Sequence, residues 1–217
     1  MTGKRARPSV VTPIALGLRA VRGGGVIVGV ALDAGAPRVV LSSFLATADE
    51  GDRLAFEPYH VAAEMKRGPG GKPTREAAAA VAEGRKRQEK LARKTLANTA
   101  RQLQGEGYEP AVAALLVNRA GWVTDLLAYS LAFPDHPPVA EGLAVRDALR
   151  AAVSHVRLKM VEMDEKSLPA LVSETLALGR AALDAHLKKL GAAAGKPWRK
   201  EQKLACLAAW LALAKVR

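Results

Sequence analysis

The sequence predicts an α/β fold, in which one mixed five-stranded sheet is flanked by helices. Segment 12–47 holds three short β-rich runs separated by turn residues, which is typical of an antiparallel meander. A long helical segment then leads to a fourth, continuously apolar run, and more helical sequence leads to a fifth. Helical crossovers place consecutive strands parallel, so the last two strands should lie in a sheet that is covered on both faces.

The meander consists of the runs 13–19, 25–32 and 38–46. The turns between them are Arg-Gly-Gly-Gly at 22–25 and Asp-Ala-Gly-Ala-Pro at 33–37. Glycine and proline at these positions favour tight reversals, so the three runs should pair in sequence order.

After the meander, residues 48–73 have loop composition, with a helical turn expected at 60–66 and a flexible glycine-rich stretch at 68–73. A long helix should begin after Thr74, whose side chain can cap it, and end near Gly105 or Gly107. Residues 100° apart place Val81 and Leu96 on one arc of this helix and its basic residues on the opposite arc. Between residues 72 and 103 there are nine basic and three acidic side chains, which fits either a solvated face or a surface that contacts phosphates.

The remaining elements follow from the same patterns. The predicted strands are 111–118, which is apolar throughout, and 155–163, which alternates; the predicted helices are 124–133, 139–153, 168–190 and 197–214.

A chain of 217 residues with 49% apolar content is expected to form one domain over 12–217, preceded by a basic flexible tail at 1–11. The single cysteine, Cys206, excludes an internal disulfide framework and a cysteine-based zinc cluster. No run is long enough for a spanning helix, so a soluble, cytoplasmic protein is expected. The net charge of +12 is compatible with a polyanionic partner, either nucleic acid or a nucleoprotein.

Three segments carry a family resemblance: IALGLR at 14–19, GVIVGV at 25–30 and LSSFLAT at 41–47. They resemble the opening strands of the ribonuclease H-like superfamily in its Holliday-junction-resolvase branch. There, a strand ending Leu-Gly-Ile-Asp is followed by a strand ending Gly-x-x-Val and by a third with Ser-Gly and a final Thr. The resemblance implies a ribonuclease H-like fold and phosphodiester cleavage by two divalent ions held by carboxylates.

Carried over one at a time, the carboxylates of that branch fall mostly on other residue types. The first-strand aspartate falls on Arg19, the fourth-strand glutamate falls near Asn118, and the Asp-x-x-Asp-Ala pattern of the last helix falls on Glu201 and Leu204. A cation at position 19 would repel a metal ion. The resemblance therefore implies the fold without its usual mechanism.

The first expectation for function is a catalytically degenerate domain, with no cofactor, that binds nucleic acid or a nucleoprotein partner through the basic helix and the basic chain ends. The residues expected to contact nucleic acid are Lys86, Arg87, Lys90, Arg93, Lys94, Arg101, Arg19, Arg199 and Lys200.

Two alternatives remain open at this point. One is a nuclease dependent on Mg²⁺ or Mn²⁺, with a rearranged site drawn from Asp33, Glu141, Glu201 and His136. Asp33 would become the first carboxylate if the alignment slipped by one strand, although it also fits a turn. The other alternative is a structural scaffold with no role at nucleic acid.

Overall fold

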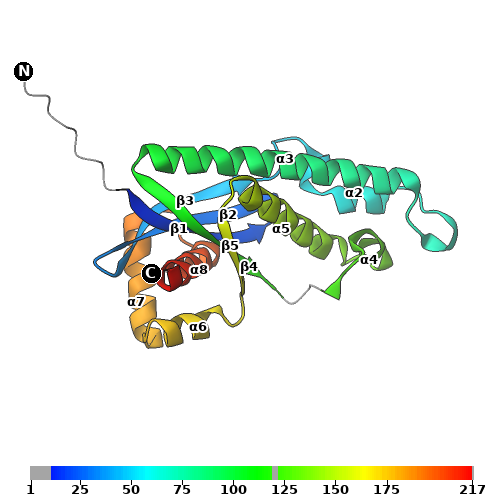
Figure 1. Cartoon of the computed structure of the whole chain (residues 1–217). Helices are drawn as coiled ribbons and strands as arrows, with labels where there is room; N and C mark the ends of the chain where they lie inside the picture. Colours follow the sequence, from blue (N-terminus) through cyan, green and yellow to red (C-terminus); the bar gives the residue numbers. More distant parts are fainter. Residues whose placement is uncertain (1–10, 119–121, 217) are drawn as a thin grey trace, which may run out of the picture.

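A computed structural model of the chain describes residues 11–118 and 122–216. Its centre is one five-stranded sheet in the order β3-β2-β1-β4-β5 (Figure 1). The strands are β1 (Thr12–Val21), β2 (Gly24–Asp33), β3 (Ala36–Ala46), β4 (Tyr108–Val117) and β5 (Lys159–Asp164). The first three strands pair antiparallel, while β4 runs parallel to β1 and β5 runs parallel to β4. The prediction of a mixed sheet with a meander and two crossover strands is confirmed.

The register aligns the C-terminal ends of β1, β4 and β5 along one side of the sheet, here called its carboxyl edge. Arg19 near the end of β1 pairs with Leu116 of β4, and Val117 of β4 pairs with Asp164 of β5. Side chains at the carboxyl ends of β1, β4 and β5 therefore lie together, as in other sheets with parallel strands. Asp33 ends the antiparallel strand β2, so it lies at the opposite edge.

Helices cover both faces of the sheet (Figure 1). They are α1 (Arg53–Phe56), α2 (Pro58–Glu64), η1 (Pro69–Gly71), α3 (Arg75–Gly105), α4 (Leu126–Ala132), α5 (Pro137–His155), α6 (Leu168–Thr175), α7 (Arg180–Ala194) and α8 (Lys200–Val216). Helices α3 and α5 pack on one face, where side chains such as Leu96 and Leu149 meet Leu16 and Leu115. Helices α6, α7 and α8 pack on the other face.

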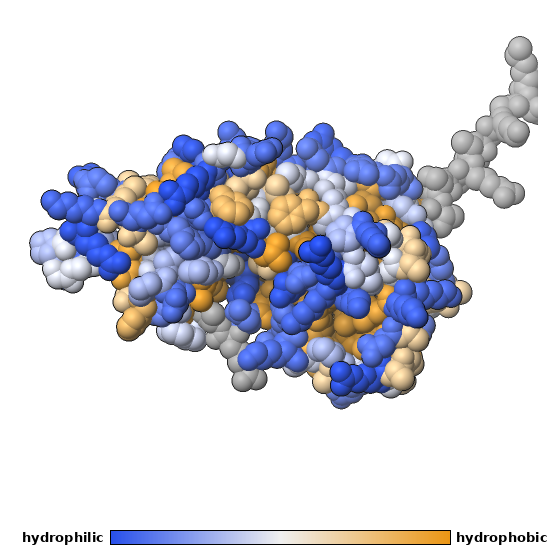
Figure 2. Space-filling view, turned by 180° about the vertical axis from the view of Figure 1, so that it is seen from behind, coloured by the Kyte–Doolittle hydropathy of each residue, from blue (hydrophilic) through white to orange (hydrophobic). Residues whose placement is uncertain are grey.

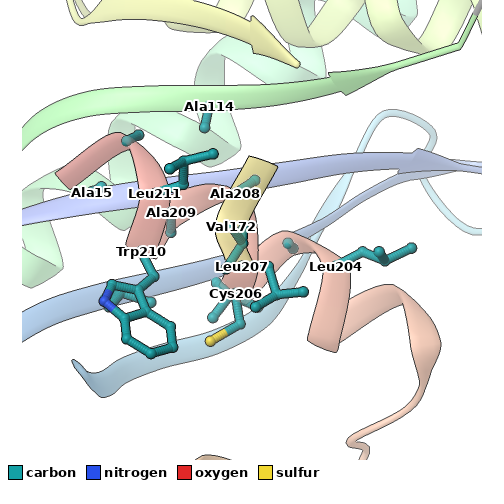
Figure 3. Packing of buried hydrophobic residues seen from close by; sticks show 14 of the residues in the cluster. Ala15, Ala114, Val172, Leu204, Cys206, Leu207, Ala208, Ala209, Trp210 and Leu211 are labelled. Atoms are coloured by element: carbon teal, nitrogen blue, oxygen red, sulfur yellow. The ribbon is translucent and has the colours of Figure 1, made fainter. Parts of the chain in front are cut away.

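Helix α8 is the most deeply buried helix of the second layer. Every residue from Leu204 to Leu213 is buried, and α8 contacts β1, β2 and β4 on one side and α6 on the other. Figure 3 shows its Leu211 and Ala208 beside Ala15 of β1 and Ala114 of β4. An all-round apolar helix is expected where both sides are covered, and the sequence of α8 has that pattern.

Two predicted elements differ from the structure, one in its middle and one at its start. The single helix predicted at 168–190 is two helices, α6 and α7. The chain is interrupted between them because Ala177 adopts φ 51° and the N–H of Leu178 donates a hydrogen bond to the carbonyl of Ser173 at 3.0 Å. The strand predicted at 155–163 begins only at Lys159, because α5 continues to His155 and the chain then turns at Arg157, which has φ 56°. Ala177 and Arg157 thus follow helix ends in the left-handed conformation, a position that glycine usually occupies.

The glycine-rich stretch after α2 contains the 3₁₀ turn η1, and the long helix begins after Thr74, whose side chain accepts a hydrogen bond from the N–H of Ala77 at 3.2 Å. The predicted start and end of the long helix are confirmed. Of the predicted basic tail, residues 1–10 lie outside the described residues. Within the described ranges, no helix combines the length and the apolar character that crossing a membrane requires.

Candidate functional site

The carboxyl edge of the sheet is organised around the side chain of Arg19. Its Nε and Nη2 atoms donate to Oε2 and Oε1 of Glu165 at 2.9 and 3.0 Å, which is a two-pronged arginine–carboxylate pair. Its Nη1 atom lies 3.7 Å from Oε1 of Glu201. The Arg19 side chain is only 19% exposed, so the ion pairs are shielded in part from water.

Local structure brings the two carboxylates to Arg19 from separate elements. Glu165 directly follows β5, and its N–H bonds to the carbonyl of Val117 at 2.9 Å, which continues the parallel pairing by one residue. Glu201 lies in the first turn of α8. Helix α8 reaches this edge because Gly17 allows close contact: a Cβ at position 17 would lie 1.8 Å from the carbonyl oxygen of Ala205.

Arg146 of α5 lies at the same edge and has a different environment. Its Nη1 atom donates to Oδ1 of Asn118 at 2.7 Å. Among the described residues no carboxylate comes within ion-pair distance of Arg146, although Glu165 lies near enough to act on it through space. Burial, followed by the positive charge of Arg150, lowers the pKa of Arg146. Arg146 is therefore a half-buried cation whose charge is not matched by a direct partner.

The side chain of Arg146 lines a cleft of about 1030 Å³, which lies between the end of β4, the starts of α3 and α4 and the middle of α5. Arg85 and Arg150 also line the cleft, and both bind Asp147, at 2.7 and 2.8 Å. Arg150 binds Glu162 as well, at 2.6 Å. Two of the three arginines are thus paired with carboxylates, whereas Arg146 has no such pair among the residues that the structure describes.

The residues at this edge do not fit the two divalent ions that the family resemblance implies. Arg19 occupies the first ligand position and already holds both Glu165 and Glu201. Asn118 is bound to Arg146, and Leu204 is buried in the core on α8. Over residues 11–118 and 122–216, no group of three or more histidine, cysteine or acidic side chains is placed to hold a metal ion.

The structure does not bring together the four residues of the rearranged nuclease site. Asp33 lies at the opposite edge of the sheet and pairs with Arg38, whose hydrogen bond lowers the pKa of Asp33. Glu201 belongs to the Arg19 cluster. His136 stacks on the ring of Tyr129 with centroids 3.8 Å apart, and its Nδ1 lies 2.8 Å from the carbonyl oxygen of Tyr129.

The Glu141 side chain accepts hydrogen bonds from the start of helix α2. Only 5% of this residue is exposed, and its Oε1 accepts hydrogen bonds from the N–H groups of Tyr59 and His60 at 2.7 and 3.0 Å. These N–H groups lie in the first turn of α2, so the carboxylate satisfies donors that the helix itself leaves free. Burial raises the pKa of Glu141. Its geometry is that of a structural cap.

The exposed face of α3 carries six of the predicted nucleic-acid contacts. They are Lys86, Arg87, Lys90, Arg93, Lys94 and Arg101, and all of them are exposed. Figure 2 shows hydrophilic side chains along the upper edge of the molecule, where α3 runs.

The arginines and lysines of this face differ in their partners. Arg87 pairs with Glu83 at 2.9 Å, and Arg93 pairs with Glu89 at 2.9 Å. Within the part of the chain that the structure describes, no carboxylate pairs with Lys86, Lys90 or Lys94. These three residues, here called the lysine row, are spaced by four residues, or about 6 Å along the helix axis.

The other three predicted contacts lie elsewhere. Arg19 is engaged with Glu165 at the edge of the sheet, and Arg199 and Lys200 are exposed at the start of α8, on the opposite layer from α3. The nine predicted residues therefore do not form one surface, because α3 and α8 cover opposite faces of the sheet.

Sequence reasoning did not include Glu165 among the candidate site residues. An acidic residue directly after a predicted crossover strand was the available signal for Glu165, since such positions meet at the carboxyl edge. The start of β5 was misplaced, but its end was close to position 165. The contact between Arg146 and Asn118 could not be predicted from the sequence, because the two residues are 28 positions apart.

The fold is that of the ribonuclease H-like resolvases. Thermus thermophilus RuvC is similar over 94% of this chain and 95% of its own, with a TM-score of 0.51 and 11% sequence identity. T. thermophilus RuvC in complex with a Holliday junction substrate is similar over 94% of both chains, with the same TM-score and identity. The yeast mitochondrial Holliday junction resolvase Ydc2 covers 96% of this chain and 85% of its own, with a TM-score of 0.44 and 11% identity.

No family model and no curated protein matches the sequence. The likeness therefore concerns the fold, and the chemistry has to be argued from the residues at the site.

Proposed function

We propose that this chain is a ribonuclease H-like domain without metal-dependent cleavage that binds nucleic acid, alone or within a nucleoprotein, through the exposed face of α3. The observation that carries the proposal is the lysine row. Like charges four residues apart on a helix destabilise it by about 0.2–0.5 kcal/mol per pair. No carboxylate among the described residues lies within ion-pair distance of Lys86, Lys90 or Lys94, although Glu83 and Lys86 attract each other through space. This fits a surface whose counter-charge comes from a polyanion.

The cleft lined by Arg146 is a second observation that supports nucleic-acid binding. A half-buried guanidinium that lacks a carboxylate partner is suited to a phosphate oxygen. The cleft lies beside the start of α3, since Val81 and Arg85 line it together with Arg146. A nucleic-acid strand on α3 could therefore extend toward Arg146. T. thermophilus RuvC, which has this fold, is known in complex with a Holliday junction substrate.

The loss of cleavage is proposed from the residues at the carboxyl edge. Metal-assisted hydrolysis needs carboxylates that are free to hold the ions. Here Glu165 and Glu201 are both engaged by Arg19.

Binding is tested by fluorescence anisotropy with labelled single-stranded, duplex and four-way branched oligonucleotides of DNA and RNA at low salt. Replacing all three members of the lysine row by glutamate should abolish binding. The matched control reverses Lys188, Lys189 and Lys215, which are exposed on α7 and α8, and should change binding far less. If the wild-type chain binds no oligonucleotide at low salt, the proposal is wrong and a scaffold without a nucleic-acid role is favoured.

Cleavage is tested with the same oligonucleotides in the presence of Mg²⁺ or Mn²⁺. The wild-type chain should leave them intact. Cleavage that disappears in Glu201→Ala or Glu165→Ala would overturn the proposed loss of activity.

A further inference from the structure

We propose that the Arg19 guanidinium is a built-in substitute for a divalent cation, and that it fills a carboxylate site which would otherwise bind one. The proposal rests on the loss of the metal site proposed above, but it does not depend on nucleic-acid binding. It goes further than that loss, because it says what the two carboxylates do and what the site does when the arginine is removed.

The first step of the argument is the arrangement of charges. Glu165 binds the Nε and Nη2 side of the guanidinium, and Glu201 approaches the Nη1 side at 3.7 Å. The two carboxylates therefore face one cation from different directions. This is the placement of oxygen ligands around a hard metal ion, with the guanidinium in the place of the ion.

The second step is burial. The side chains of Arg19, Glu165 and Glu201 are 19%, 26% and 33% exposed, so water does not fully screen them from one another. Two partly buried carboxylates with no cation between them would repel each other. Arg19 removes this repulsion, and its positive charge also excludes Mg²⁺ or Mn²⁺ from the same space.

The third step is that the backbones carrying the two carboxylates are positioned without Arg19. The position of Glu165 is fixed by its backbone, which continues the β4–β5 pairing through Val117. The position of Glu201 is fixed by α8, which packs tightly on β1 at Gly17. Shortening Arg19 therefore leaves a gap flanked by two carboxylates, with the amide of Asn118 at the end of the neighbouring strand.

The test is Mn²⁺ binding by the full chain, measured by electron paramagnetic resonance of the free ion and by isothermal titration calorimetry. Arg19→Ala and Arg19→Gln remove the charge, whereas Arg19→Lys keeps it. Arg38→Ala is the matched control, because Arg38 pairs with Asp33 at the opposite edge of the sheet. Each variant is checked by circular dichroism with and without millimolar Mn²⁺.

We expect Arg19→Ala and Arg19→Gln to bind one Mn²⁺ at least about tenfold more tightly than the wild-type chain, since ligand charge sets the affinity of such sites. Arg19→Lys and Arg38→Ala should bind no more tightly than wild type. Adding Glu165→Gln to Arg19→Ala should remove the gain. Variants that fold only when Mn²⁺ is present would also support the proposal.

Two results would overturn it. One is that neither neutral variant binds Mn²⁺ more tightly than the wild-type chain, and the other is that both neutral variants are unfolded whether or not Mn²⁺ is present. None of these measurements uses nucleic acid, so failure here leaves the binding role of α3 standing. Conversely, a chain that binds no oligonucleotide can still confirm the role of Arg19.

Discussion

Oε1 of Glu141 lies 2.7 Å from the backbone nitrogen of Tyr59 and accepts its hydrogen bond. The two residues are 82 positions apart, so this contact ties α5 to the start of α2. The same oxygen accepts from His60, and both N–H groups depend on it. Glu141 is thus a buried carboxylate with a structural task, although its sequence setting also fitted a catalytic one.

Replacing Glu141 by alanine should lower the free energy of unfolding by about 1–3 kcal/mol, because the N–H group of Tyr59 loses its acceptor in a buried place. Glu141→Gln retains an acceptor oxygen and should be much less destabilising. Urea unfolding at neutral pH followed by circular dichroism measures both. Equal loss in the two variants would show that the charge of Glu141, and not its acceptor oxygen, supports α2.

The pH dependence of stability gives a separate test of Glu141. Burial raises its pKa in the folded chain, so the folded chain holds this proton more tightly than the unfolded chain. The resulting stabilisation is present below the unfolded pKa of about 4.3 and is lost as pH rises through the folded pKa. The stability of the wild-type chain relative to Glu141→Gln should therefore fall as pH rises through this window. A difference that grows in favour of the wild type at higher pH would contradict this assignment.

The lysine row should contribute measurably to the salt dependence of nucleic-acid binding. Each phosphate contact contributes about 0.9 to the slope of log K against log salt on duplex DNA. Replacing Lys86, Lys90 and Lys94 by glutamine should reduce the magnitude of the slope by about 2.7 if each contacts one phosphate. Anisotropy titrations over a range of NaCl concentrations measure the slope. An unchanged slope would place the binding surface away from α3.

Arg146 and Arg150 should respond differently to truncation, although both line the cleft. Arg150→Ala breaks ion pairs with Asp147 and Glu162 and should lower Tm. Arg146→Ala removes a half-buried charge without a carboxylate partner, so Tm should stay the same or rise, while oligonucleotide binding should weaken. Differential scanning calorimetry and anisotropy on the two variants separate the effects. Loss of stability in Arg146→Ala without loss of binding would indicate a purely structural residue.

Gly17 should tolerate no side chain. A Cβ there would lie 1.8 Å from the carbonyl oxygen of Ala205, which is backbone and cannot turn aside. Gly17→Ala should destabilise the chain by about 1–3 kcal/mol or more, because β1 and α8 would have to separate. Gly142→Ala is the control: it lies within α5 with nothing within 4 Å of its Cβ, and it should stabilise by about 0.5–1 kcal/mol. Chemical unfolding of both variants gives the comparison.

Much of the fold followed from local signals in the sequence. The turns at 22–25 and 33–37 defined the meander, and Thr74 marked the start of α3. The errors came where the chain turns without the usual residue: Ala177 and Arg157 both adopt positive φ where glycine would have signalled a helix end. Such stops depend on the packing of the elements that follow, which a single sequence does not reveal.

The candidate site was less predictable, because it depends on contacts between distant segments. The resemblance drew attention to Arg19 but could not say that its guanidinium is held by Glu165, which is 146 positions away. In the sequence, the lysine row and the paired arginines Arg87 and Arg93 also fall on one arc of α3. Only the positions of Glu83, Glu89 and Asp52 distinguish the charges that are matched from those that are not.

The burial of α8 has a consequence for how the chain acquires its structure. Residues 200–216 form the main cover of one face of the sheet, together with α6 and α7, while the strands that they cover begin at residue 12. During synthesis the meander and α3 are therefore complete long before this apolar face can be covered. The nascent chain must carry an exposed apolar sheet until α8 has left the ribosome, which makes this interval the period when chaperone binding or aggregation is most expected.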